Sequence, residues 1–349
     1  MTTQNANIGK GAPRAFAFWI VAGLGLLLLS ISLAVSLGAV RVPVGTVWGI
    51  IAHHIAPGLF AEGGWERSQE AIVWQLRLPR TLLAALVGAG LALVGATLQA
   101  VTRNPLADPH LLGISSGGAF GAITALLHTG LIFGLVTVPL FAFLGAFFAT
   151  ALVLIVSRVA NATSSDRLVL AGVAVSFIVM ALANVMIFLG DPRATHTVVF
   201  WMLGGLGLAQ WAQLIFPLGV LAVCALWLLT RARDFDAMTI GDETAATLGI
   251  NVTGFRLTAF VVGALITGVM VAFSGIIGFV GLMVPHIVRM IVGGANFKVF
   301  PASMVTGAIF LVWCDIIART VMAPDDIPIG VVTGLIGGVF FVWLLRRRA

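Results

Sequence analysis

The sequence predicts an all-α protein that crosses a membrane many times. Of its 349 residues, 60% are hydrophobic and only 9% are charged, and the mean hydropathy is +1.11. A water-soluble domain cannot bury that much apolar surface. The apolar runs lack period-two alternation, and 41 glycines suit closely packed membrane helices better than a β-barrel. We therefore expect a polytopic helical bundle that forms one domain over residues 1–349, with a membrane core over about 16–346.

Ten apolar runs form the expected spans, since a crossing takes about 20 apolar residues. The runs are 16–40, 71–101, 111–128, 136–158, 167–190, 210–230, 255–275, 280–293, 299–320 and 327–345. The third and eighth runs are short for a full crossing. A further apolar piece, 198–207, is too short to cross, so we expect it to lie at the membrane interface or to re-enter. The first run is longer than a signal-peptide core and is expected to remain as an uncleaved helix.

The distribution of basic residues predicts the orientation. An even number of spans places both termini on one side of the membrane. With the N-terminus inside, thirteen Lys and Arg residues lie in inner segments and six in outer segments, which is the bias typical of a cytoplasmic inner face. We therefore interpret the net charge of +6 as an orientation signal and expect no nucleic-acid partner.

The residues that could carry chemistry are few. No phosphate-cradling G-x-x-x-x-G-K-[ST] loop is present, so the chain is not expected to hydrolyse nucleotides or to be an enzyme. Asp315 is the only acid well inside a span, and Arg319 four residues later favours an ion pair over a proton relay. The six histidines are scattered, so we expect no metal site. Cys224 and Cys314 lie in apolar runs and are expected to be packing residues without a disulfide.

The polar segment 236–249 is a first candidate site. It can form a short helix with Gly249 as its C-cap and with Met238, Ala245 and Leu248 on one face. Such a helix could be a solvated connection, or it could dock into a groove of another protein.

A second candidate is the start of the second span, where Pro79 fits a first helical turn. Arg77 and Arg80 there could snorkel to the interface, or exposed guanidinium groups could capture carboxylates of a soluble partner.

Six blocks of sequence occur in an order that matches one known family. They are "WQLRLPRTLLAALVGAGLALVGATLQAVTRNPLADPHLLGISSGGAFGA" (74–122), "SDRLVLAGVAV" (165–175), "FWMLGGLG" (200–207), "GDETAATLGI" (241–250), "SGIIGFVGLMVPHIVRM" (274–290) and "DDIPIGVVTGLIGG" (325–338). Over about 16–346 the chain resembles the FecCD-type permeases, the membrane subunits of type II ATP-binding-cassette (ABC) importers for ferric siderophores, haem and cobalamin.

The resemblance implies ten membrane helices per subunit and a dimer, expected to be a homodimer, with the pathway along its two-fold axis. It also implies two cytoplasmic ATPase subunits that consume ATP-Mg, a periplasmic substrate-binding protein, and a place in the bacterial inner membrane with no cofactor in this chain. On family frequency, a ferric siderophore is the first expectation for the substrate, haem the second and cobalamin the third. The rival from another class, an autonomous ion-coupled carrier, is disfavoured by the scarcity of buried carboxylates.

The resemblance also assigns roles to particular residues. It implies that the 236–249 helix is the coupling helix seated in a cleft of the ATPase, and that Arg77 and Arg319 receive acidic residues from the two lobes of the binding protein. The residues that match the family's coupling motif are Gly241, Glu243, Ala246, Leu248 and Gly249. One departure is Val339, where relatives commonly have proline, so we expect a straighter last span.

The block "GLMVPHIVRM" (281–290) is the third candidate site. Pro285 lacks a backbone donor and is expected to end or kink a helix, with His286 and Arg289 binding the carbonyl groups so exposed. We interpret the block as a hinge near the cytoplasmic gate and the ATPase interface.

Overall fold

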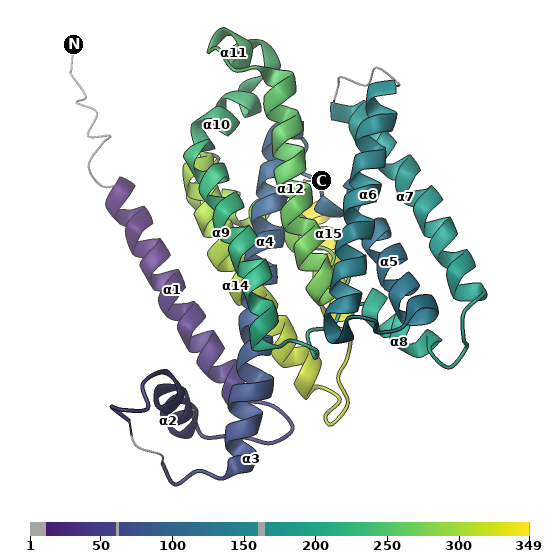
Figure 1. The fold of residues 1–349 in the computed structure, drawn as a ribbon. Coiled ribbons are helices and arrows are strands. Elements are labelled where there is room, and N and C mark those ends of the chain that lie inside the picture. The colour runs from purple at the N-terminus through teal and green to yellow at the C-terminus, as the bar shows by residue number, and fades with distance from the viewer. Residues whose placement is uncertain (1–11, 61–62, 160–164, 349) are drawn as a thin grey trace, which may run out of the picture.

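The fold is a bundle of membrane-length helices (Figure 1). The computed structural model describes residues 12–60, 63–159 and 165–348, and all regular structure among them is helical. In these residues, eight helices are long and apolar enough to cross a membrane. They are α1 (Ala12–Ser36), α4 (Leu78–Thr102), α6 (Thr137–Val159), α7 (Ser165–Phe188), α9 (Trp211–Thr230), α12 (Val252–Ser274), α14 (Asn296–Thr320) and α15 (Ile329–Arg348). The helix that contains α4 starts earlier, at α3 (Arg67–Glu70), and continues through the π-helical turns Ala71–Arg77.

The two runs that were short for a crossing form two short helices, α5 (Ile114–Thr124) and α13 (Val280–Val292). Both begin in the protein interior, where Ile114 and Val280 are fully buried. The segments that precede them meet, because Nε2 of His110 lies 2.8 Å from the carbonyl oxygen of Ile277. The ten expected spans therefore correspond to eight long helices and two partial ones.

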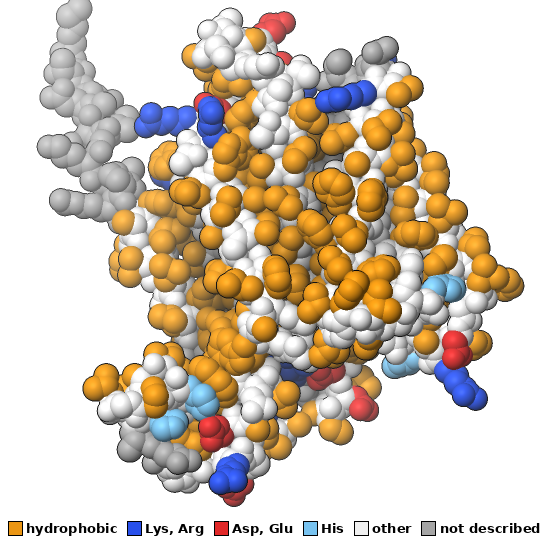
Figure 2. Space-filling model, viewed as in Figure 1, with side chains coloured by type: hydrophobic (Ala, Val, Ile, Leu, Met, Phe, Trp, Pro, Cys, Tyr) orange, Lys and Arg blue, Asp and Glu red, His pale blue; other side chains and the backbone are white. Residues whose placement is uncertain are grey.

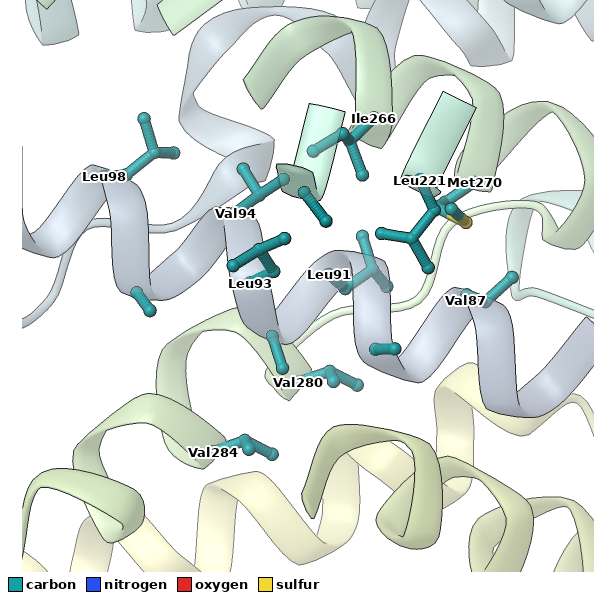
Figure 3. Packing of buried hydrophobic residues seen from close by; sticks show 14 of the residues in the cluster. Val87, Leu91, Leu93, Val94, Leu98, Leu221, Ile266, Met270, Val280 and Val284 are labelled. Atoms are coloured by element: carbon teal, nitrogen blue, oxygen red, sulfur yellow. The ribbon is translucent and has the colours of Figure 1, made fainter. Parts of the chain in front are cut away.

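The core lies around α4, the most enclosed of the long helices. Its glycines allow backbones to approach closely: a Cβ on Gly88 would lie 2.2 Å from the carbonyl oxygen of Gly307, and one on Gly95 would lie 1.9 Å from that of Gly281. Close approach through small residues is how membrane helices gain packing energy, since lipid is as apolar as the core. Figure 3 shows the α4 side chains Leu91, Val94 and Leu98 among buried residues of α9, α12 and α13.

Shorter helices lie at the two ends of the bundle (Figure 1). At one end are α10 (Ala232–Ile240) and α11 (Asp242–Thr247), and at the opposite end are α2 (Val44–Ile55), α3 and α8 (Thr195–Met202). The expected interfacial piece 198–207 corresponds to the second half of α8 and the irregular segment after it. Hydrophobic side chains cover the middle of the bundle, and most charged side chains lie toward its two ends (Figure 2). This distribution matches a membrane-embedded belt.

Candidate functional site

The segment expected to form one coupling helix forms two. Helix α10 ends at Ile240, Gly241 has a non-helical backbone with φ 158° and ψ 157°, and α11 starts at Asp242. Asp242 and Glu243 occupy the first turn of α11, where the helix dipole favours acidic side chains. The prediction of a continuous helix over 236–249 was therefore wrong at Gly241. We call residues 232–249 the knob.

Helix α11 of the knob is fixed to the bundle by the carboxylate of Asp242. Asp242 accepts two hydrogen bonds from Nη2 of Arg256 on α12, at 2.8 and 2.9 Å, and lies 3.4 Å from Nη2 of Arg103 at the end of α4. Charge-assisted bonds of this kind are stronger than neutral ones. Helix α11 is thus held to the two most enclosed helices of the bundle.

The free face of the knob presents the residues that match the coupling motif. Glu243, Ala246 and Gly249 are exposed, and Leu248 is 67% exposed. Leu248 was expected on the same face as Met238 and Ala245, but those two are fully buried, so this prediction was wrong. Leu248 lies beyond the last turn of α11, and the chain changes direction there.

Gly249 supports that change of direction. Its φ is +84°, in the left-handed region that suits glycine, and the next residue, Ile250, donates its N–H to the carbonyl oxygen of Ala245 at 3.1 Å. This geometry confirms the predicted C-cap.

The block around Pro285 differs from the expected hinge. Pro285 was expected to end or kink a helix; helix α13 continues through Pro285, so the first of these two alternatives was wrong. The carbonyl oxygen of Gly281, four residues earlier, has no proline N–H to accept. It accepts instead from Nε2 of Gln99 on α4 at 3.3 Å, as does the carbonyl oxygen of Leu282 at 3.2 Å. Gln99, which the sequence did not single out, therefore supplies a donor to these two carbonyl groups.

His286 and Arg289 have other contacts. The His286 ring meets Phe340 of α15 edge to face, with ring centroids 6.2 Å apart. Arg289 donates to the carbonyl oxygen of Ala96 on α4 at 3.2 Å and to Oδ1 of Asn296 at 3.1 Å. The block thus joins α13 to α4, α14 and α15. The role of Pro285, His286 and Arg289 in a gate stays a prediction.

Arg77 and Arg319 were expected to be exposed at the opposite end of the bundle. Both are buried, with exposed fractions of 8% and 7%. Arg77 donates to the carbonyl oxygens of Val35 and Ser36 at 3.0 and 3.1 Å, and to that of Val40. Arg319 donates to the carbonyl oxygen of Ala34 at 2.9 Å.

These bonds satisfy backbone groups where α1 ends. The last turn of a helix leaves carbonyl groups without intrahelical donors, and the two guanidinium groups supply them. The first span ends at Ser36, where the two guanidinium groups bond its last carbonyl groups, and not at 40 as expected.

A buried ion cluster lies beside these arginines. Asp315, 1% exposed, has Nε of Arg319 at 2.9 Å, which confirms the pair expected from their spacing, and Nε of Arg80 at 2.8 Å. Arg80 also pairs with Asp326 at 2.5 Å. Sequence reasoning missed the second arginine, although a buried acid in a span signals that such partners are required.

A cavity opens next to the ion cluster. It has a volume of about 600 Å³ and is lined by His196, Asp325 and Asp326 together with Val199, Phe200, Leu203 and Pro328. Elsewhere, Cys224 and Cys314 are buried free thiols, as predicted. In the described part of the chain, no three His, Cys, Asp or Glu side chains are grouped so that they could hold a metal ion.

Comparison with known proteins shows relatives along nearly the whole chain. The FecCD transport family matches residues 26–347. The hemin transport system permease protein HmuU of Yersinia pestis is 37% identical over 292 residues, which are 81% of this chain and 87% of that protein. The vitamin B12 import system permease protein BtuC of Klebsiella pneumoniae is 39% identical over 328 residues, which are 93% of this chain and 92% of that protein.

The fold agrees with a solved structure. A transporter described as a metal-chelate type ABC transporter in an inward-facing conformation superposes with a TM-score of 0.82 at 28% identity, over 95% of this chain and 99% of that chain. The helical bundle, the membrane belt and the sequence relatives therefore lead to one conclusion. The chain belongs to the FecCD transport family and is a multi-pass membrane permease of an ABC importer.

Proposed function

We propose that two copies of this chain form the membrane pathway of an importer that moves an iron chelate into the cytoplasm. The knob carries the proposal, because it combines an exposed face with a firm attachment. Ile240 and Leu248 are 71% and 67% exposed at its surface, while Asp242 holds α11 to α12 and α4. A solvated connection needs no such attachment. A surface that receives force from an ATPase does.

In this proposal the knob faces the cytoplasm and each knob is seated in one ATPase subunit, which uses ATP-Mg; this chain itself holds no cofactor. Gly241, Glu243, Ala246, Leu248 and Gly249 form the coupling surface. The bias of basic residues toward the inner segments supports this orientation, in which both termini are cytoplasmic in a bacterial inner membrane.

The test is co-purification and transport with the partner ATPase. Leu248→Asp places a charge on an exposed position, so it is expected to leave folding unchanged and to remove ATPase binding. Leu208→Asp is the matched control, because Leu208 is also exposed but lies near the other end of the bundle. ATPase binding that survives in Leu248→Asp would contradict the coupling surface, and uphill uptake by the permease alone in liposomes would contradict the proposed function.

The second copy covers the helices that this chain leaves most open. Helices α7 and α15 are the least buried of the membrane-length helices, and they expose Phe177, Phe188, Leu335 and Leu345. Lipid covers the rest of the belt. Cross-linking of single cysteines on α15 between two copies tests the homodimer, and its absence in a functional complex would refute this arrangement.

At the opposite end we propose that a periplasmic binding protein docks through acidic residues, which Arg77 and Arg319 receive. Arg77 is bonded to three neutral carbonyl oxygens, and a carboxylate is a stronger partner for a guanidinium than a neutral acceptor. Docking would then exchange these bonds. Arg77→Lys keeps the charge but loses the planar fork, so affinity for the binding protein should fall while its salt dependence remains. Unchanged affinity at low salt would contradict the role.

The relatives support the proposed substrate class, because the names of two of them refer to metal chelates. The hemin permease and the metal-chelate type structure support an iron chelate, either a ferric siderophore or haem. The vitamin B12 permease supports cobalamin as the alternative within the family. Titration of the cognate binding protein with haemin, a ferric siderophore and cobalamin decides among them, and tight binding of cobalamin alone would overturn the iron assignment.

An autonomous ion-coupled carrier is a poorer interpretation. Such a carrier needs a carboxylate that can gain and lose a proton on the pathway. Asp315 lies between Arg80 and Arg319, an arrangement that holds it as a structural ion.

A further inference from the structure

A chain of hydrogen bonds leads from α10 of the knob to α13. Oδ1 of Asp236 accepts the backbone N–H of Asn296 at 2.7 Å and its side-chain amide at 2.9 Å. Oδ1 of Asn296 in turn accepts from Nη2 of Arg289 at 3.1 Å. Arg289 lies in the last turn of α13 and also holds the carbonyl oxygen of Ala96 on α4. The four helices α10, α14, α13 and α4 are thus connected by charge-assisted bonds.

We propose that Asp236, Asn296 and Arg289, which we call the relay, transmit movement of the knob to α13 and so act as positioning residues for coupled transport. The inference rests on the proposed function, in which an ATPase moves the knob. It assigns the role to residues outside the coupling motif.

The hydrogen bonds between Asp236 and Asn296, the first link of the relay, are costly to break. Asn296 is the first residue of α14 and is fully buried. The N–H groups of a first helical turn lack intrahelical acceptors, and a carboxylate is favoured at this positive end of the helix. Separating Asp236 from Asn296 would leave buried donors without a partner, which is costly. Helix α10 and the start of α14 therefore move together.

The last helix that the relay reaches is α15. Just before the first residue of α13, the ring of Phe279 lies 6.3 Å from that of Phe341, and in the middle of the helix the ring of His286 lies 6.2 Å from that of Phe340. Both phenylalanines belong to α15, which is among the least enclosed helices of the bundle. A shift of α13 therefore reaches the helix that, in the proposed dimer, faces the second copy.

The other attachment of the knob has a different end point. Asp242 connects α11 to α12 and α4, the two most enclosed of the long helices. This attachment anchors the knob to the rigid part of the bundle. The relay instead leads from α10 through the short helix α13 to α15. In this proposal the Asp242 attachment keeps α11 in place, whereas the relay transmits movement of α10 to α13 and α15.

The experiment uses the full permease in complex with its ATPase and a fluorophore on α15. Val339→Cys provides the labelling site because Val339 is 71% exposed in the single chain and lies on the helix proposed to face the second copy, so the label senses movement at that contact; the native thiols Cys224 and Cys314 are buried. The fluorescence change on addition of ATP-Mg reports movement of α15, and it requires no knowledge of the substrate. ATP hydrolysis, bound ATPase and melting temperature are measured on the same samples.

The variants separate the relay from general stability. Asp236→Ala and Asn296→Ala should reduce the ATP-induced signal about 5-fold or more, in the range of typical allosteric couplings, while ATP hydrolysis and bound ATPase change less than about two-fold. Asp236→Asn keeps the Oδ1 acceptor and should retain most of the signal. Asp234→Ala is the matched control, since Asp234 is on the same helix but pairs with Arg231, the residue just before the knob.

The outcomes decide between the relay and its alternatives. A wild-type signal in Asp236→Ala and Asn296→Ala would refute the relay, and so would equal losses in Asp234→Ala and Asp236→Ala. An Asp236→Asn variant as defective as Asp236→Ala would also overturn it, because the acceptor is retained. Arg289→Lys, which cannot span both acceptors, provides the same test if Asp236→Ala is not recovered. A wild-type permease that binds no ATPase would instead overturn the proposed function.

Discussion

Replacing Gly95 with alanine tests the packing of α13 against α4. A Cβ on Gly95 would lie 1.9 Å from the carbonyl oxygen of Gly281, whereas ordinary contacts start at 3.4 Å, so α13 must retreat by about 1.5 Å. That movement would stretch the 3.3 and 3.2 Å bonds from Gln99 to the carbonyl oxygens of Gly281 and Leu282. The substitution therefore disturbs both the close contact and the group that replaces the missing proline donor.

The expected cost has two parts. Overpacking of a core costs about 1–3 kcal/mol. A buried carbonyl group left without a donor costs about 1–3 kcal/mol more. We therefore expect the free energy of unfolding to fall by about 2–6 kcal/mol in Gly95→Ala, the sum of these ranges.

Reversible unfolding in mixed micelles measures this free energy. Gly219→Ala is the matched control: Gly219 also lies inside a long helix, α9, but a Cβ there would meet nothing within 4 Å. Alanine should be neutral at this position or stabilise by up to about 1 kcal/mol, because it is the better helix former. Equal stability of Gly95→Ala and the wild type would refute the close packing of α4 on α13.

Three further substitutions test other contacts by the same unfolding measurement. Gln99→Leu should cost about 1–3 kcal/mol because it removes the donor to two buried carbonyl groups; a neutral result would show that these groups have another partner. Asp315→Ala should cost about 3–5 kcal/mol because it leaves buried arginine charge unpaired. The control Asp325→Ala, at an exposed position, should have little effect, and similar costs for the two variants would contradict the ion cluster. Gly249→Ala should cost about 1–2 kcal/mol through its left-handed backbone alone, since a Cβ there meets nothing within 4 Å. Gly249→Asn should recover part of the loss. An alanine variant as stable as the wild type would refute the left-handed backbone as the origin of the cost.

Features that depend on local spacing were predicted well. The membrane helices follow from runs of apolar residues, and the two short runs did become partial helices. The Asp315–Arg319 pair follows from a separation of four residues on one helix. Gly249 was identified as a C-cap because few other residues adopt its backbone conformation.

Features that depend on contacts between helices were missed or misplaced. Arg80 reaches Asp315 from 235 positions away, and Gln99 reaches Gly281 from 182 positions away, so no local pattern reveals either bond. The burial of Arg77 depends on where α1 ends, which leaves carbonyl groups within its reach. Leu248 was placed on one face with Met238 and Ala245 because the helical period was continued through Gly241, where the structure breaks it.

The uninterrupted helix Arg67–Thr102 has a mechanical consequence. Its 36 residues extend for about 54 Å at about 1.5 Å per residue, well beyond a hydrocarbon layer of about 30 Å. Arg77, in the first third of this helix, donates to the end of α1, and Arg103, just past its last residue, meets the carboxylate of Asp242. A tilt of about one degree displaces the tips relative to each other by about 1 Å over this length. Because so small a tilt would disturb the contacts at both faces of the membrane, this helix holds the end of α1 and the start of α11 in a fixed relation, and movement of the knob has to pass through other helices.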